Sequence, residues 1–157
     1  KTFGVEIDKE RLNEADEYAE GKNIQLNIVR GDIRSLAFDD ESFSFVYSYN
    51  SIFHMNKKDI ERSIEEIKRV LLPEGLIYVN FLSTDDFLNG RGEKVGEGEF
   101  SQEESTGKVI HSFHTDSEAD RYFDDMDMLV KQKREIERKV EGETIKQSYL
   151  DYIARKL

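Results

Sequence analysis

The chain of 157 residues is long enough for one domain and too short for two ordinary ones. Its formal net charge is -11, from 34 acidic and 23 basic residues, which excludes a basic nucleic-acid-binding module and argues against an anionic membrane surface as a partner. The absence of cysteine excludes disulfide scaffolds and thiolate metal sites and favours a reducing, cytoplasmic location. The 10 Phe and 7 Tyr residues are too many for a disordered tail, so we expect a packed core.

The first part of the chain alternates between strand and helix patterns. Thr2–Ile7 is an apolar run typical of a strand, and the apolar spacing after it predicts a helix that Asp8 caps and Gly21 ends. Ile24–Val29 predicts a second strand and Phe43–Ser48 a third, whose apolar density suggests burial on both faces.

Residues 57–71 carry the clearest helix pattern of the chain. One apolar stripe runs along it, and Asn56 with Asp59 can cap its first turn; the stripe consists of Ile60, Ile64, Ile67 and Leu71. Pro73–Gly75 is expected to stop this helix before a fourth strand at Leu76–Leu82. The alternation of strand and helix is typical of an α/β fold with a mostly parallel sheet.

The second part of the chain has a weaker pattern. Asp85–Gly107 holds five glycines and many acids and is predicted as a long loop, which could close over the substrate side. Val109–Phe113 predicts a short strand, and the capping-box spacing of Thr115 and Glu118 predicts a short helix. Residues 126–157 fit either a helix or a strand pair, and the break at Glu141–Glu143 favours an antiparallel hairpin.

Ligands of open α/β sheets bind at the carboxyl ends of the strands, so the residues there are candidates for a site. Glu6, at the end of the first strand, can accept hydrogen bonds from both hydroxyls of a ribose. Asp32 follows the second strand and can accept from an exocyclic amine, while Gly31 lets a ligand approach the backbone. The third strand leads into Tyr49 and Asn50.

Each of these residues also has a structural interpretation. Asp8 is taken as a helix cap, and Asp32 after glycine is often a turn residue. His54 titrates near neutral pH and could serve as a base, but it precedes a helix among apolar neighbours, which favours a structural role. His111 and His114 lie in or beside an apolar strand without a second set of ligands, so no metal is expected.

Three segments together show a resemblance that no single residue carries. From Thr2 to about Leu82 the chain resembles the class I S-adenosylmethionine-dependent methyltransferases. The segments are FGVEIDKERLNEA (3–15), VRGDIRSLAFDDESFSFVYS (29–48) and EIKRVLLPEGLIYVNF (66–81). The resemblance implies a Rossmann-like methyltransferase fold, α/β with a mostly parallel sheet and a C-terminal antiparallel hairpin, and S-adenosyl-L-methionine (SAM) as the cofactor.

The resemblance also implies roles for individual residues. Glu6 would hold the ribose of the cofactor and Ile7 would pack on its adenine. Asp32 would contact the adenine amine, with the Ile33 backbone beside it. Tyr49 would face the cofactor, and the substrate-side candidates are Asn50 and His54.

The chain departs from the family's pattern at three places. The family's first strand, with its Gly-rich loop, has no counterpart and would lie before Lys1, between the strands that begin at Thr2 and Phe43; we therefore expect an N-terminally incomplete domain. Ser44 stands where the family usually has an acid. Residues 47–50 differ from the Asn-Pro-Pro-aromatic motif of enzymes that methylate nucleic-acid bases.

These observations predict a single methyltransferase domain over residues 1–157. Its parts are a cofactor-binding α/β part (1–82), a loop and short helix over the substrate side (83–125) and a closing hairpin (126–157). The expected function is methyl transfer from SAM to a small-molecule acceptor whose identity, like the oligomeric state, the sequence leaves open. The alternatives are a catalytically inactive binding or regulatory module of the same fold and, less well matched, a nucleotide-dependent oxidoreductase.

Overall fold

A computed structural model describes residues 1–104, 107–140 and 142–157 of the chain. The strands and helices are β1 (Gly4–Glu6), α1 (Lys9–Lys22), β2 (Ile28–Arg30), β3 (Phe43–Ser48), α2 (Lys57–Val70), β4 (Leu71–Ser83), β5 (Glu93–Gly96), β6 (Glu99–Glu104), β7 (Gly107–His114), the 3₁₀-helix η1 (Glu118–Phe123), β8 (Met126–Val140) and β9 (Glu143–Lys156). The order confirms the predicted α/β alternation in the first part and the antiparallel hairpin, β8 with β9, at the end.

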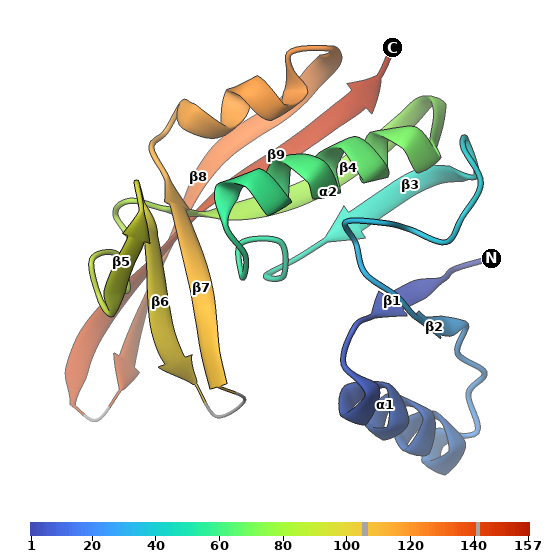
Figure 1. Ribbon diagram of the computed structural model, residues 1–157, viewed down its shortest axis with the longest axis horizontal. Helices are drawn as coiled ribbons and strands as arrows, with labels where there is room; N and C mark the ends of the chain where they lie inside the picture. Colours follow the sequence, from blue (N-terminus) through green and yellow to red (C-terminus); the bar gives the residue numbers. More distant parts are fainter. Residues whose placement is uncertain (105–106, 141) are drawn as a thin grey trace.

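The strands form two separate sheets. β1 and β2 pair in parallel, while the other strands form a seven-stranded sheet around β4. β4 has β9 antiparallel along one edge; its other edge pairs in parallel with β3 and then, at Leu82 and Ser83, with β7. Figure 1 shows β1, α1 and β2 beside β3, and the β5–β6–β7 strands at the opposite end of the sheet.

Helix α1 begins where the sequence predicts. The Asp8 carboxylate accepts hydrogen bonds from the backbone N–H groups of Glu10 and Arg11 at 2.7 and 3.1 Å, which confirms its role as the cap. The prediction that Gly21 ends the helix is wrong by two residues. Asn23 ends it in the left-handed conformation (φ 54°), because Asn tolerates that conformation and its N–H bonds back to the carbonyls of Ala19 and Glu20.

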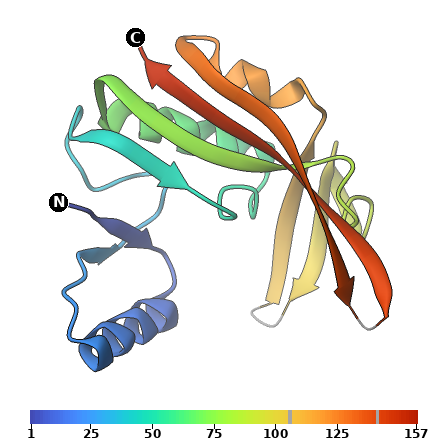
Figure 2. The same ribbon diagram turned by 180° about the vertical axis from the view of Figure 1, so that it is seen from behind.

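Helix α2 packs its apolar stripe on one face of the larger sheet. Ile60, Ile64 and Ile67 are fully buried against β4 and β9 residues such as Phe81 and Tyr152. The Asn56 side chain accepts from the Asp59 N–H at 2.8 Å, as predicted for the cap. Figure 1 shows α2 and η1 on this face, and Figure 2 shows the opposite face without a described helix over it.

The prediction of a turn at Pro73–Gly75 is wrong: these residues lie inside β4, which begins at Leu71, directly after α2. The backbone of Leu71 is already extended (φ -74°, ψ 136°), so helix passes into strand without a loop. Residues 72–75 instead form an irregularity in the strand pairing. Phe43 pairs with Leu71 and Phe45 with Leu76, so the register of β4 against β3 shifts at residues 72–75. Glu74 accommodates it at a positive φ of 63°.

The prediction that β3 is buried on both faces is also wrong for the described residues. Val46 packs against the core beneath α2, whereas Phe45 and Tyr47, which point to the other face, are 52% and 60% exposed. The reason is that α2 covers only one face of this strand. The strand was predicted correctly from its apolar residues, but two of them, Phe45 and Tyr47, lie on an exposed surface instead of in the core.

The predicted loop at Asp85–Gly107 contains two strands. β6 pairs antiparallel with β5 and with β7, so this segment extends the sheet. Its glycines mark turns: Gly90, Gly92 and Gly98 have φ values of 80°, 89° and 68°. The strands escaped prediction because they are short and polar, and of their residues only Phe100 packs against a core cluster. Residues 105–106 of the predicted loop lie outside the described residues.

The predicted helix after Thr115 is the 3₁₀-helix η1. The Glu118 carboxylate reaches back to accept from the Thr115 N–H at 3.4 Å, which is one half of the predicted capping box. Ala119, Tyr122 and Phe123 are buried and close the core on the side of β8 and β9.

A buried carboxylate on β9 joins the two strands of the β8–β9 hairpin to each other and to β4. Asp151 on β9 is 3% exposed; Arg134 Nε on β8 donates to it at 2.8 Å and the Tyr78 hydroxyl on β4 donates at 3.0 Å. Burial alone would raise the pKa of Asp151, but the hydrogen bonds from Arg134 and Tyr78 outweigh it, so the pKa lies below its usual value.

We expect Asp151→Asn to lower the free energy of unfolding at neutral pH by about 1.5–3 kcal/mol, because it removes a charged hydrogen-bond acceptor. A carboxyl with a lowered pKa stabilises the fold above its unfolded pKa of about 3.9, and this stabilisation is lost as the pH falls through the folded value. Urea unfolding of both proteins should therefore show a difference that shrinks on acidification. A difference independent of pH would contradict the ionised role of Asp151.

Candidate functional site

The carboxyl ends of β1, β2 and β3 face a large groove. Its volume is about 970 Å³, and it runs between β1 and β3. Among the described residues β1 pairs only with β2 and β3 only with β4, so no described strand fills the space where the sequence predicts a further one. Of the predicted site residues, Ile7, Asp32, Ile33, Tyr49 and His54 line this groove.

Glu6 lies at the last position of β1 rather than on the groove wall. Its Oε1 accepts from the Asp8 N–H at 2.8 Å, a contact that orients the carboxylate at the start of α1. No hydrogen bond from a described residue reaches Oε2. The neighbouring Ile7 side chain is 57% exposed on the groove side, so an acceptor and an open apolar surface stand next to each other.

Asp32 is held by the side chain of Arg34, two residues away along the chain. Arg34 Nη2 lies 2.6 Å from Asp32 Oδ2, and its Nε donates to both carboxylate oxygens at 3.0 Å. Arg34 in turn reaches Asp59 at 2.9 Å. The Arg34 hydrogen bonds lower the pKa of Asp32. Asp32 is therefore fixed as an anion, and a ligand amine would have to share its oxygens with Arg34.

The segment after β3 is locked by two asparagines. The Asn50 backbone N–H donates to Asn80 Oδ1, and Asn80 Nδ2 donates to Asn50 Oδ1, both at 2.7 Å. Asn80 is fully buried on β4, so it fixes Asn50 in its left-handed conformation (φ 51°). The ring of Tyr49, just before it, stacks on that of Tyr78 at 6.3 Å between centroids and an interplanar angle of 29°, and it lies beneath the Arg134 guanidinium.

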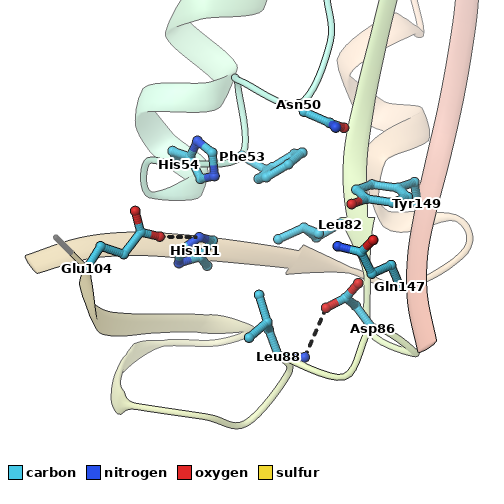
Figure 3. Close-up of a pocket in the computed structure, with 10 residues that line it drawn as sticks. All are labelled: Asn50, Phe53, His54, Leu82, Asp86, Leu88, Glu104, His111, Gln147 and Tyr149. Atoms are coloured by element: carbon cyan, nitrogen blue, oxygen red, sulfur yellow. Dashed lines mark hydrogen bonds and ion pairs between the residues drawn. The ribbon is translucent and has the colours of Figure 1, made fainter. Parts of the chain in front are cut away.

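A second cavity of about 300 Å³ opens beyond Asn50, on the side of β6, β7 and β9. Its lining residues are Asn50, Phe53, His54, Leu82, Asp86, Leu88, Glu104, His111, Gln147 and Tyr149 (Figure 3). His54 belongs to the walls of both cavities, and the two spaces therefore adjoin at this side chain. The small cavity combines an apolar floor with a few polar groups, which is typical of a ligand pocket.

The pKa values of Asp86, His54 and His111 in this pocket are shifted toward the neutral forms of these side chains. Burial raises the pKa of Asp86, which is 4% exposed and accepts from the Leu88 and Ser148 N–H groups. Burial also lowers the pKa of His111. The pKa of His54 is lowered by desolvation of its ring and by repulsion from His111, although part of the side chain is open to solvent. Burial of these groups thus favours uncharged His54, Asp86 and His111 side chains in the pocket.

Sequence reasoning found the groove residues and missed most of the pocket. His54 and Asn50 were candidates, but Asp86, His111 and Gln147 reach the cavity from three different segments. One signal existed: His111 lies inside the short predicted strand Val109–Phe113. It carried no weight alone, because its pocket partners lie on segments that the sequence did not show to be adjacent.

The described ranges contain no group of three or more His, Asp or Glu side chains arranged to hold a metal ion. In the same ranges no helix is long and apolar enough to cross a membrane.

Residues 1–79, half of the chain, match the sequence model of the methyltransferase domain. The chain belongs to the S-adenosylmethionine-dependent methyltransferases. The cofactor of this family is SAM, and the matched region includes every residue proposed from the sequence for the site.

Solved structures show the same fold over nearly the whole chain. A SAM-dependent methyltransferase from Methanosarcina mazei superposes with a TM-score of 0.79 at 20% identity, covering 99% of this chain and 81% of that chain. A second one, from Clostridium acetobutylicum, gives a TM-score of 0.68 at 14% identity, covering 99% of this chain and 75% of that one. The likeness confirms the Rossmann-like methyltransferase fold.

Curated relatives match more closely but over less length. A sterol 24-C-methyltransferase of Aspergillus fumigatus is 34% identical over 93 residues, which are 57% of this chain and 24% of that enzyme. One from Gibberella zeae is 35% identical over 89 residues, 55% of this chain and 23% of that enzyme. The chain spans about a quarter of the length of these relatives.

Proposed function

We propose that this chain forms the catalytic part of a SAM-dependent methyltransferase that acts on a small molecule. The observation that carries the proposal is that one side chain, His54, lines both the large groove and the small pocket. Methyl transfer requires a cofactor space and an acceptor space that share one opening, because the methyl group passes directly from one molecule to the other.

The groove side offers the contacts that a nucleoside needs. Glu6 presents a carboxylate with Oε2 unengaged by the described residues, which suits the two hydroxyls of a ribose. Ile7 offers an exposed apolar surface for a purine. Asp32, Ile33 and Tyr49 also line this groove. These residues fit SAM, which when bound supplies a methyl group already activated as part of a sulfonium.

The protein's own contribution is then alignment and exclusion of water. Asn80 holds the Tyr49–Asn50 segment in place through two hydrogen bonds to Asn50. Tyr49 lines the groove and Asn50 lines the pocket, so these bonds fix the proposed cofactor space and acceptor space relative to each other. Phe53, Leu82 and Tyr149, all nearly buried, line the pocket with apolar surface. Alignment of this kind removes much of the entropic barrier to a two-molecule reaction.

The size and charge of the site support a small acceptor. A volume of about 300 Å³ lies at the lower end of the range for ligand pockets. The net charge of -11 disfavours nucleic acid, because a polyanion is repelled by an acidic surface. We propose accordingly that neither nucleic acid nor a membrane surface is the partner of this site, and that the protein acts in the cytoplasm.

Two measurements on the full-length protein test this function. Calorimetry should show binding of SAM and of S-adenosylhomocysteine but not of NAD, and binding of NAD alone would favour an oxidoreductase. With SAM labelled in its methyl group, label should appear in the low-molecular-mass fraction of a cell extract. SAM binding without any transfer would identify the inactive module, and label in protein or RNA would contradict a small acceptor.

A further inference from the structure

The charged residues around the small pocket are all acidic. Among the described residues that line it, Asp86 and Glu104 carry carboxylates, and none is a lysine or an arginine. An anionic ligand would therefore lose hydration without gaining a basic partner from this wall, and burial of an unpaired charge is costly. The lining thus disfavours a ligand with a carboxylate, sulfate or phosphate group and suits a neutral or positively charged one.

Of the two carboxylates, Asp86 is engaged by the backbone on both of its oxygens. Oδ1 accepts from the Leu88 N–H at 2.9 Å, and Oδ2 accepts from the Ser148 N–H at 2.8 Å. The residue is 4% exposed, and burial raises its pKa. Asp86 therefore joins the segment after β4 to β9 and has no free oxygen to offer a ligand cation.

Glu104, the last residue of β6, is the accessible carboxylate of the pocket. Its side chain is 40% exposed, and its Oε1 lies 3.2 Å from His111 Nε2. No hydrogen bond from a described residue engages Oε2. Figure 3 shows this carboxylate beside His54 and His111 at one side of the pocket, while Tyr149 lies at the other. A molecule in the pocket can therefore meet Glu104 without breaking a hydrogen bond of the fold.

The negative charge of Glu104 already acts on the two imidazoles beside it. Burial lowers the pKa of both His54 and His111, and Glu104 opposes the shift at each ring. The rings are neighbours, meeting edge-on at 4.9 Å between centroids. Arg11, which lines the groove and not the pocket, adds to the lowering at His54. Because burial outweighs the carboxylate, the imidazoles favour their neutral forms, and no described lining residue supplies the positive charge that Glu104 attracts.

Much of the remaining wall is apolar. Phe53, Leu82 and Tyr149 are 4%, 3% and 6% exposed and belong to one core cluster, against which Leu88 packs. The rings of Phe53 and Tyr149 lie 6.2 Å apart between centroids. A molecule that fills the pocket thus needs a hydrocarbon part for this wall and a positive group for the side at Glu104.

We infer that the small pocket takes an organic amine in its ammonium form, with its hydrocarbon part against Phe53 and Tyr149 and its ammonium group on Glu104. This inference rests on the proposed function and names the class of its acceptor; it concerns binding and assigns the methyl group to no atom. An ammonium donates hydrogen bonds and accepts none, which suits an unengaged carboxylate oxygen. The net charge of -11 also draws cations toward the protein.

Three fluorinated probes of similar shape test the inference. At neutral pH 4-fluorobenzylamine is a cation, 4-fluorobenzyl alcohol is uncharged and 4-fluorobenzoate is an anion. Fluorine NMR titrations of the full-length protein should show the amine binding about fivefold more tightly than the alcohol, the effect of a partly exposed ion pair. The benzoate should bind most weakly. Failure of the amine to bind, or an affinity no higher than that of the alcohol or the benzoate, would overturn the inference.

A pair of variants separates Glu104 from the overall charge of the protein. Glu104→Gln keeps the size of the side chain and removes its charge, so the preference for the amine over the alcohol should vanish. Glu103→Gln is the matched control, because Glu103 is the neighbouring exposed acid of β6 and does not line the pocket. Each variant removes one negative charge, yet the control should keep the preference. Loss of the preference in both variants, or in neither, would contradict the role of Glu104.

SAM binding distinguishes failure of this inference from failure of the proposed function. Calorimetry should give the same SAM affinity for Glu104→Gln and wild type, because Glu104 lines the pocket and not the groove. A wild-type protein that binds SAM without preferring the amine would refute the inference alone. A wild-type protein that prefers the amine but does not bind SAM would refute the proposed function and leave the pocket's selectivity for cations established.

Discussion

Replacement of Glu6 by alanine is expected to weaken SAM binding by about 10²- to 10⁴-fold, with little change in stability. The carboxylate is proposed to accept two hydrogen bonds from the ribose, and hydrogen bonds to a charged group are worth about 1.5–3 kcal/mol each. Glu6 is partly exposed, and the variant loses one hydrogen bond, from the Asp8 N–H, so the fold should tolerate the change. Calorimetry on the full-length protein measures the affinity directly.

Two further variants make the Glu6 experiment specific. Glu6→Gln keeps an oxygen for the Asp8 N–H and removes only the charge, so it should bind SAM with intermediate affinity. Glu10→Ala removes an exposed carboxylate of similar charge one turn away, in the first turn of α1, and should bind as wild type does. An unaltered affinity of Glu6→Ala would refute the assignment of the ribose to this residue.

The largest effect on stability is expected from Ile64→Ala in helix α2. Ile64 is fully buried in the middle of the stripe that packs on β4 and β9, and truncation there removes one methylene and two methyl groups and leaves a cavity. Substitutions of this kind lower the free energy of unfolding by about 2–5 kcal/mol. Urea unfolding followed by circular dichroism gives the value.

Lys58→Ala is the control for Ile64. Lys58 lies on the exposed face of the same helix, so its removal should change the free energy of unfolding by less than about 0.5 kcal/mol. If Ile64→Ala unfolded at the same urea concentration as this control, the result would contradict the burial of Ile64 between α2 and the sheet. The comparison therefore tests whether α2 covers the core through its Ile60–Ile67 face, and it requires no ligand.

The parts of the fold that sequence predicts are those with local signals. Asp8 and Asn56 cap helices through contacts within a few residues, and the Ile60–Ile67 stripe needs only the helix period to be recognised. The β8–β9 hairpin follows from a break between two β-rich runs. Each of these features is determined by neighbours along the chain, and each was predicted close to its observed position.

The parts that sequence does not predict depend on tertiary partners. β5 and β6 carry no apolar alternation, and only pairing with β7 makes them strands. Leu71 leaves the helix two residues before Pro73, because pairing with Phe43 draws it into the sheet. The ion pair between Arg34 and Asp32 occupies carboxylate oxygens that were proposed to contact the cofactor. The two residues are only two positions apart, but their types alone do not determine that their side chains pair.

The candidate site also has one part that the sequence predicts, the groove, and one part that it does not, the small pocket. The groove residues lie at strand ends, where the order of elements alone brings them together, and the family resemblance supplied their roles. The pocket is built from the β3–α2 connection, the end of β4 and strands β6, β7 and β9. No pattern in the sequence brings Asp86, His111 and Gln147 to one cavity, because their proximity follows from pairings between distant segments.

The position of β4 between β3 and β9 has a consequence for how the chain folds. Tyr78 pairs with Tyr47 on one side and with Ile153 on the other, so one neighbour comes from the preceding helix–strand unit and the other from a segment far downstream. On the ribosome, β4 can join β3 early, but its other edge stays open until β9 has emerged. Such long-range pairing slows folding and leaves an unpaired edge exposed to other chains. A nascent chain halted between β4 and β9 should therefore be the form most dependent on chaperones.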